Sequence, residues 1–156
     1  AIVFALVRAG AEKIFVCNRN DDRAERLIAE FALTPKADQL QNIPWANRIS
    51  WLERQKVDLI INATSVGMHP RIDDMPLTPK AFTSGAVAID LVYNPSHTAF
   101  LQAAKTAGAA VVSGLGMLIH QGVAALELWS GLHLDIDDIY ADLENALTTA
   151  FIPIKP

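Results

Sequence analysis

The chain has 156 residues, of which 51% are hydrophobic and 19% are charged, with a formal net charge of −4. This size fits one domain with a sizeable core, and the acidic balance argues against nucleic acid as a main partner, because phosphate binding needs a basic surface. Cys17 is the only cysteine, which excludes an intrachain disulfide and fits a reducing compartment such as the cytoplasm. No apolar run approaches the roughly 18 residues that span a bilayer, so we expect no membrane partner.

The apolar pattern predicts strands that alternate with helices. The predicted elements are, in chain order, a helix over 1–9, a strand over 14–17, a helix over 23–31, a strand over 46–49, a helix over 50–55, a strand over 58–62, a strand over 87–92, a helix over 98–107, a strand over 110–113, a helix over 117–129 and a final helix to about 147. Asp21 or Asp22 is predicted to cap the second helix, and Asp135 or Asp137 the last one. This order predicts an α/β fold with a doubly wound parallel sheet of the Rossmann-like kind.

The first predicted helix is apolar almost all round, so we expect it to be buried on several sides. It has no cap and no start signal. A chain that opens in this way is expected to begin inside a domain.

The most informative motif follows the predicted strand at 58–62. There the apolar run breaks into residues 62–68, Asn-Ala-Thr-Ser-Val-Gly-Met. Strand ends of this kind bind ligands in open α/β sheets, because polar side chains and free backbone groups converge there. Thr64 and Ser65 are therefore candidate binding residues.

A second polar segment, residues 18–20, follows the predicted strand at 14–17. An acidic residue at this place in a dinucleotide-binding fold would accept hydrogen bonds from the ribose 2′-hydroxyl of NAD. Asn18 and Arg19 stand there instead, and Arg23 follows at the helix start, which favours the 2′-phosphate of NADP through charge, fork geometry and helix dipole. Asp21 and Asp22 are near enough in sequence to reach the ribose, so NAD use is left open.

Two further motifs are residues 90–95, Asp-Leu-Val-Tyr-Asn-Pro, with Thr98 and Leu101, and residues 114–118, Gly-Leu-Gly-Met-Leu, with Gln121. Together with residues 18–20 and 62–68, these motifs resemble the shikimate dehydrogenase family, including its quinate/shikimate dehydrogenases, in order and spacing. The resemblance implies a reversible NADP-dependent reduction of 3-dehydroshikimate to shikimate. The family form Asn-Arg-Thr is changed at Asn20, which loses a hydroxyl contact.

The resemblance also implies roles for single residues. It assigns Tyr93 and Gln121 to the substrate. It assigns these residues to the cofactor: Asn18, Arg19, Arg23, Thr64, Ser65, Leu91, Gly114, Met117 and Leu118. The glycines of residues 114–116 are expected to let the backbone approach the nicotinamide closely.

Some parts of the family pattern have no match in this chain. The family has a first strand and a Gly-rich pyrophosphate turn before the helix that begins at Ala1, and an N-terminal catalytic domain with a lysine and an aspartate. We therefore expect residues 1–156 to form a partial NADP-binding domain that is inactive alone. A C-terminal helix within 132–150 is expected to extend toward the catalytic domain.

Several alternatives stay open at this point. One is a quinate/shikimate dehydrogenase that uses NAD, and another is a non-catalytic nucleotide-binding fragment. Glutamyl-tRNA reductases share an Asn-Arg-Thr-like strand end, but the Gly-Met of residues 67–68 and the Met-Leu-x-x-Gln stretch fit the shikimate family better.

The oligomeric state, monomer or homodimer, is undecided. The four histidines lack metal-ligand spacing, so no metal site is predicted, and His120 is interpreted as structural.

Overall fold

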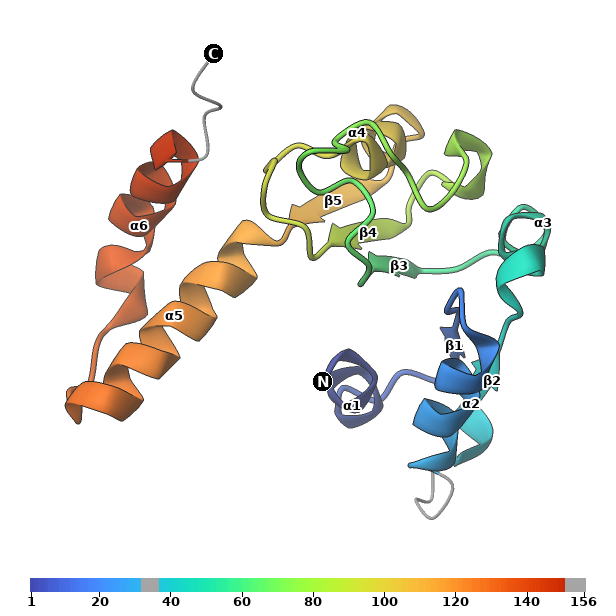
Figure 1. Cartoon of the computed structure of the whole chain (residues 1–156), viewed down its shortest axis with the longest axis horizontal. Coiled ribbons are helices and arrows are strands. Elements are labelled where there is room, and N and C mark those ends of the chain that lie inside the picture. Colours follow the sequence, from blue (N-terminus) through green and yellow to red (C-terminus); the bar gives the residue numbers. More distant parts are fainter. Residues whose placement is uncertain (32–36, 151–156) are drawn as a thin grey trace. The chain divides into compact units, whose positions relative to one another are not determined.

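The computed structural model describes residues 1–31 and 37–150 and divides the chain into two compact units, Ala1–Gln55 and Lys56–Pro156 (Figure 1). Each unit is built from parallel strands and helices, so the predicted parallel α/β, Rossmann-like class is confirmed. No helix of the described residues has the length and apolar character needed to cross a membrane.

The first unit is a parallel pair of strands with helices. Its elements are α1 (Ile2–Arg8), β1 (Ile14–Val16), α2 (Asp21–Ala29), the short 3-10 turn η1 (Ala37–Gln39), β2 (Leu40–Asn42), the short 3-10 turn η2 (Trp45–Asn47) and α3 (Arg48–Leu52). β1 pairs with β2, and Val16 lies opposite Asn42 at their carboxyl ends. Helix α2 contacts β2, and the ring of Phe15 on β1 packs against Trp51 of α3 at 4.4 Å between centroids.

Three expectations for this unit are wrong. The strand predicted at 46–49 lies earlier, at β2, because Pro44 is followed by a 3-10 turn that leads directly into α3. Helix α2 is capped by neither aspartate. It begins at Asp21, so both aspartates lie within its first turn, and the side chain of Asn20 accepts the Arg23 backbone N–H as the cap. Helix α1 contains no buried residue and Phe4 is 55% exposed, since no described element packs closely over it.

The second unit contains a three-stranded parallel sheet. Its elements are β3 (Leu59–Asn62), η3 (Pro79–Ala81), β4 (Val87–Asp90), α4 (Ala99–Thr106), β5 (Ala110–Ser113), α5 (Leu115–Ser130) and α6 (Ile136–Ala150). The strand order is β3-β4-β5, and helix α4 contacts both β4 and β5. Phe100 of α4 is buried and meets Phe82 edge-on at 5.0 Å between centroids. These strands and helices agree with the prediction within about two residues at most ends.

Helices α5 and α6 pack on each other around a second apolar cluster. Leu115, Ile119 and Val123 form its buried part, and Tyr140 and Leu143 of α6 lie against them. Helix α5 ends at Gly131, whose φ of 71° is a left-handed conformation that favours glycine. The predicted stop at Gly131 is therefore confirmed, and α5 begins at Leu115, two residues before the predicted start.

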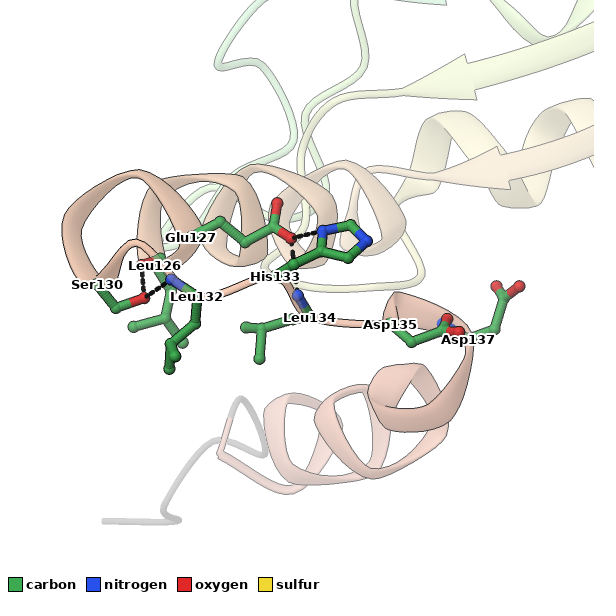
Figure 2. Close-up of polar contacts among 8 residues, drawn as sticks. All are labelled: Leu126, Glu127, Ser130, Leu132, His133, Leu134, Asp135 and Asp137. Atoms are coloured by element: carbon green, nitrogen blue, oxygen red, sulfur yellow. Dashed lines mark hydrogen bonds and ion pairs between the residues drawn. The ribbon is translucent and has the colours of Figure 1, made fainter.

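A side-chain contact closes the connection between these two helices. One carboxylate oxygen of Glu127 accepts the Leu134 backbone N–H at 2.8 Å and meets Nδ1 of His133 at 2.9 Å (Figure 2). Asp135 then accepts the Asp137 backbone N–H at the start of α6, so Asp135 is the one of the two predicted residues that caps this helix. The pKa of Glu127 is lowered, mainly by the Leu134 hydrogen bond and further by His133.

Candidate functional site

The polar motifs of the second unit meet at one edge of its sheet. Asn62 at the end of β3 lies opposite Asp90 at the end of β4, and Asp90 lies opposite Ser113 at the end of β5. The loops that follow these strands carry the residues predicted to bind cofactor and substrate. Because the strands are parallel, all three loops leave from the same edge, where open α/β sheets bind ligands.

The loop after β3 is folded around the side chain of Asn62, which is buried. Its Oδ1 accepts both the backbone N–H of Thr64 at 3.1 Å and the Thr64 hydroxyl at 2.7 Å. The Thr64 hydroxyl in turn accepts the Val66 backbone N–H at 3.1 Å. Thr64 and Ser65 are both exposed, but the Thr64 side chain is bonded within the loop, whereas the Ser65 hydroxyl forms no hydrogen bond among the described residues.

The loop after β4 is anchored by Asp90, a residue to which the sequence motifs gave no role. Its carboxyl group is fully buried and accepts hydrogen bonds from Asn62, from the Thr98 hydroxyl and from the Val92 backbone N–H. Burial raises the pKa of Asp90, and the three hydrogen bonds act in the opposite direction. Leu91 and Tyr93, the predicted nicotinamide and substrate contacts, are half-buried on this loop.

The two glycines near the start of α5 have packing reasons. A Cβ on Gly114 would lie 2.5 Å from the Leu91 carbonyl oxygen, so the chain crosses the end of β4 too closely for any side chain. A Cβ on Gly116 would lie 2.9 Å from the Tyr140 hydroxyl of α6. The predicted contact of these glycines with nicotinamide stays a prediction.

The structure separates the other predicted residues of α5. Leu118 packs against the cluster shared with α6, which gives it a structural role, whereas Met117 is 40% exposed. Gln121 is exposed on α5. His120 is exposed and lies beside the ring of Tyr140 at 5.9 Å between centroids, and its structural role stays a prediction.

The predicted 2′-phosphate residues lie at the carboxyl end of β1 in the first unit. Arg19 and Arg23 are exposed on either side of the start of α2, and Asn18 accepts the Asn20 backbone N–H at 3.0 Å. Asn20, the position that departs from the family form Asn-Arg-Thr, shapes this turn because its side chain caps α2.

The sequence motifs gave no role to Trp45 and Arg48, which follow β2 at the same end of the first unit's strand pair. Asp21 accepts the Trp45 backbone N–H at 3.2 Å, which ties the two strand ends together and occupies one of the two carboxylates considered for NAD. The Arg48 guanidinium lies over the Trp45 ring at 3.9 Å and donates to the Trp45 carbonyl. Burial raises the pKa of the Cys17 thiol, while the nearby charge of Arg48 acts in the opposite direction. Only the Trp-x-x-Arg spacing in the sequence could have indicated this pair.

Among the described residues, no group of three or more His, Cys, Asp or Glu side chains is arranged to hold a metal ion. The second unit has two surface hollows. One is lined by residues 56–58 and 83–86, at the amino ends of β3 and β4, and the other by α4 together with residues 73–80.

These features define the chain as a Rossmann-like α/β protein with its polar motifs at the carboxyl ends of parallel strands. Residues 114–144 match the family described as the Shikimate 5′-dehydrogenase C-terminal domain. The chain is 37% identical over 138 residues to a shikimate dehydrogenase (NADP(+)) of Desulforamulus reducens, covering 88% of this chain and 47% of that protein. Over most of its length the chain is therefore similar to shikimate dehydrogenases.

Solved structures show the same similarity. Shikimate 5-dehydrogenase from Thermus thermophilus, in complex with NADP(H) and shikimate, has a TM-score of 0.74 and 36% identity, covering 96% of this chain and 50% of that one. Quinate dehydrogenase from Corynebacterium glutamicum, in complex with NAD, has a TM-score of 0.80 and 25% identity. The match covers 95% of this chain and 50% of that one. The chain thus spans about half the length of the relatives it matches.

Proposed function

We propose that this chain is the nucleotide-binding part of an NADP-dependent shikimate dehydrogenase. The reaction is the reversible transfer of a hydride between NADP and the hydroxyl-bearing carbon of shikimate, which gives 3-dehydroshikimate. The observation that carries the proposal is the pairing of Asn62 with Asp90, because it brings the two strand-end motifs of the family to one edge of one sheet.

The choice of NADP rests on the end of β1. Arg19 and Arg23 flank the start of α2, where two guanidinium groups and the positive end of a helix favour a 2′-phosphate. An aspartate that could bind the ribose of NAD, Asp21, is instead bonded to Trp45. Asn18 shapes the turn that presents Arg19.

At the nicotinamide end, the cofactor contacts proposed are Ser65, Leu91, Gly114 and Met117. Tyr93 and Gln121 are proposed to face the substrate, as the family resemblance implies. When bound, NADP supplies the hydride chemistry, and this chain holds and orients it.

The general acid and base are proposed to come from the lysine and aspartate of the family's catalytic domain. No lysine–carboxylate pair in this chain matches that motif. Removal of the hydroxyl proton needs such a group, so we expect these 156 residues alone not to turn over shikimate.

The end of α5 is proposed to pack on that catalytic domain. Leu128 is 82% exposed and Trp129 is 81% exposed, and Leu126 and Leu132 beside them are also exposed. The Glu127 contact and the Ser130 hydroxyl, which donates to the Leu126 carbonyl at 2.6 Å, give this apolar turn a fixed shape (Figure 2). Large apolar side chains gathered in this way mark interaction surfaces.

With a single cysteine in the chain, we propose the cytoplasm as the place of the reaction.

A quinate dehydrogenase that uses NAD is the second candidate, favoured by the likeness to the Corynebacterium enzyme. The test is an assay of the complete protein that carries this sequence, with shikimate or quinate and either NADP or NAD, followed by absorbance of the reduced cofactor. The proposal predicts that shikimate with NADP gives the highest kcat/KM. A higher kcat/KM for quinate with NAD would support the second candidate, and no turnover with any pair would contradict both.

A further inference from the structure

Asp90 is a buried carboxyl group at the last residue of β4, and neither the predicted site nor the proposed reaction uses it. It is 0% exposed, and its two oxygens accept from three different segments. A buried carboxyl group is costly unless its oxygens are satisfied by hydrogen bonds. Such a fully bonded group can fix the relative positions of the segments that donate to it.

The first segment is the loop after β3. The Asn62 side-chain amide donates to Asp90 Oδ1 at 2.9 Å and to the Val66 carbonyl at 3.1 Å, while its oxygen holds Thr64. Asn62 thus transmits the position of Asp90 to the whole turn. Both Thr64 and Ser65 are exposed, but the Thr64 hydroxyl is hydrogen-bonded within this turn, whereas the Ser65 hydroxyl has no hydrogen bond among the described residues.

The other two segments lie after β4. The Val92 backbone N–H donates to Asp90 Oδ1 at 3.0 Å, which fixes the chain between Leu91 and Tyr93. The Thr98 hydroxyl donates to Asp90 Oδ2 at 2.6 Å and accepts the Leu101 backbone N–H at 3.2 Å, so the same carboxyl group also holds the start of α4.

We propose that Asp90 is a positioning residue that holds the loops after β3 and β4 in the shape that presents Ser65 and Leu91 to the nicotinamide half of the cofactor. The assignment rests on the proposed function. It makes Ser65 the hydroxyl that contacts the cofactor in this loop and gives Thr64 a purely structural role. A carboxylate suits the position because all three of its neighbours donate, whereas an asparagine would direct an N–H donor at one of them.

The test compares two ligands in the complete protein that carries this sequence. NADPH contains both the adenosine 2′-phosphate and the nicotinamide, whereas 2′,5′-ADP contains the adenosine 2′-phosphate but no nicotinamide. We expect Asp90→Asn to weaken NADPH about tenfold and to leave the affinity for 2′,5′-ADP unchanged, both measured by fluorescence titration or calorimetry. Asp74→Asn is the matched control, since Asp74 is an exposed carboxylate of the same unit paired with Arg71 at 3.5 Å, and it should change neither affinity.

A second pair of variants covers the case in which Asp90→Asn does not fold. Thr98→Val removes the donor to Asp90, and Thr98→Ser keeps it, so NADPH affinity should fall in the first and recover in the second. Unchanged NADPH affinity in Asp90→Asn, or an equal loss for both ligands per folded molecule, would overturn the positioning role. A wild-type protein that bound neither ligand would overturn the proposed function and this assignment together.

Discussion

The close crossing of Gly114 over the end of β4 makes a sharp prediction for Gly114→Ala. The backbone angles of Gly114, φ −70° and ψ −5°, suit any residue, so only the space around a new Cβ matters. That atom would lie 2.5 Å and 2.7 Å from the Leu91 carbonyl oxygen and carbon and 2.9 Å from the Asp90 carbonyl oxygen. All three are backbone atoms, which cannot rotate away, so α5 or the end of β4 must move.

Overpacking of this kind costs about 1–3 kcal/mol of unfolding free energy. Gly122, inside the same helix, is the matched control, because a Cβ there meets no atom within 4 Å. Gly122→Ala should therefore raise the unfolding free energy by about 0.5–1 kcal/mol, since alanine favours helix more than glycine does. Urea unfolding of both variants measures the difference. If both substitutions stabilised the protein equally, the close crossing would be refuted.

Three further predictions concern the cofactor, the substrate and pH. Arg19→Ala should weaken NADP binding about 10–100-fold, the loss of one charge-assisted contact, and barely change NAD binding; equal loss for both cofactors would contradict a 2′-phosphate site. Gln121→Ala should raise the KM for shikimate at nearly constant melting temperature, because Gln121 is exposed, and a large stability loss with normal kinetics would make it structural. The lowered pKa of Glu127 means that its stabilisation is present above the ordinary range of glutamate pKa values and is lost as pH falls through the lowered pKa. Glu127→Gln should thus flatten the acid side of the stability curve from urea unfolding, and an unaltered acid side would show that the ionisation of Glu127 contributes nothing to stability.

Local sequence predicted best where one strand carries a continuous apolar run. β3, β4 and β5 were found in this way, because strands of a parallel sheet carry few polar residues. In β5 this apolar run is nevertheless exposed, with Val111 37% and Val112 48% accessible. β2 was missed because Leu40-Gln41-Asn42 has one apolar residue, and its pairing with β1 creates the strand. Such pairing depends on distant residues that a local pattern does not contain.

The caps and the site show the same limit. Asp21 looks like a helix cap in sequence, but its carboxylate bonds to Trp45, 24 residues further on, and Asn20 takes the cap. The motif at 62–68 correctly marked a polar strand end, yet it could not separate Thr64, whose hydroxyl bonds within the loop, from Ser65, whose hydroxyl has no such bond among the described residues. Asp90 stood inside a quoted motif without a role, because its burial and its donors appear only in the folded sheet.

We expect NADP to bind at the carboxyl ends of these parallel strands. Residue-resolved NMR titration of the protein with NADP tests this most directly, because each backbone amide reports its own environment. We predict shifts at residues 18–23, 64–65 and 91–93, and none at residues 56–58 and 84–86, which lie at the amino ends of β3 and β4. Shifts confined to the amino ends of the strands, or no shifts at a saturating cofactor concentration, would contradict it.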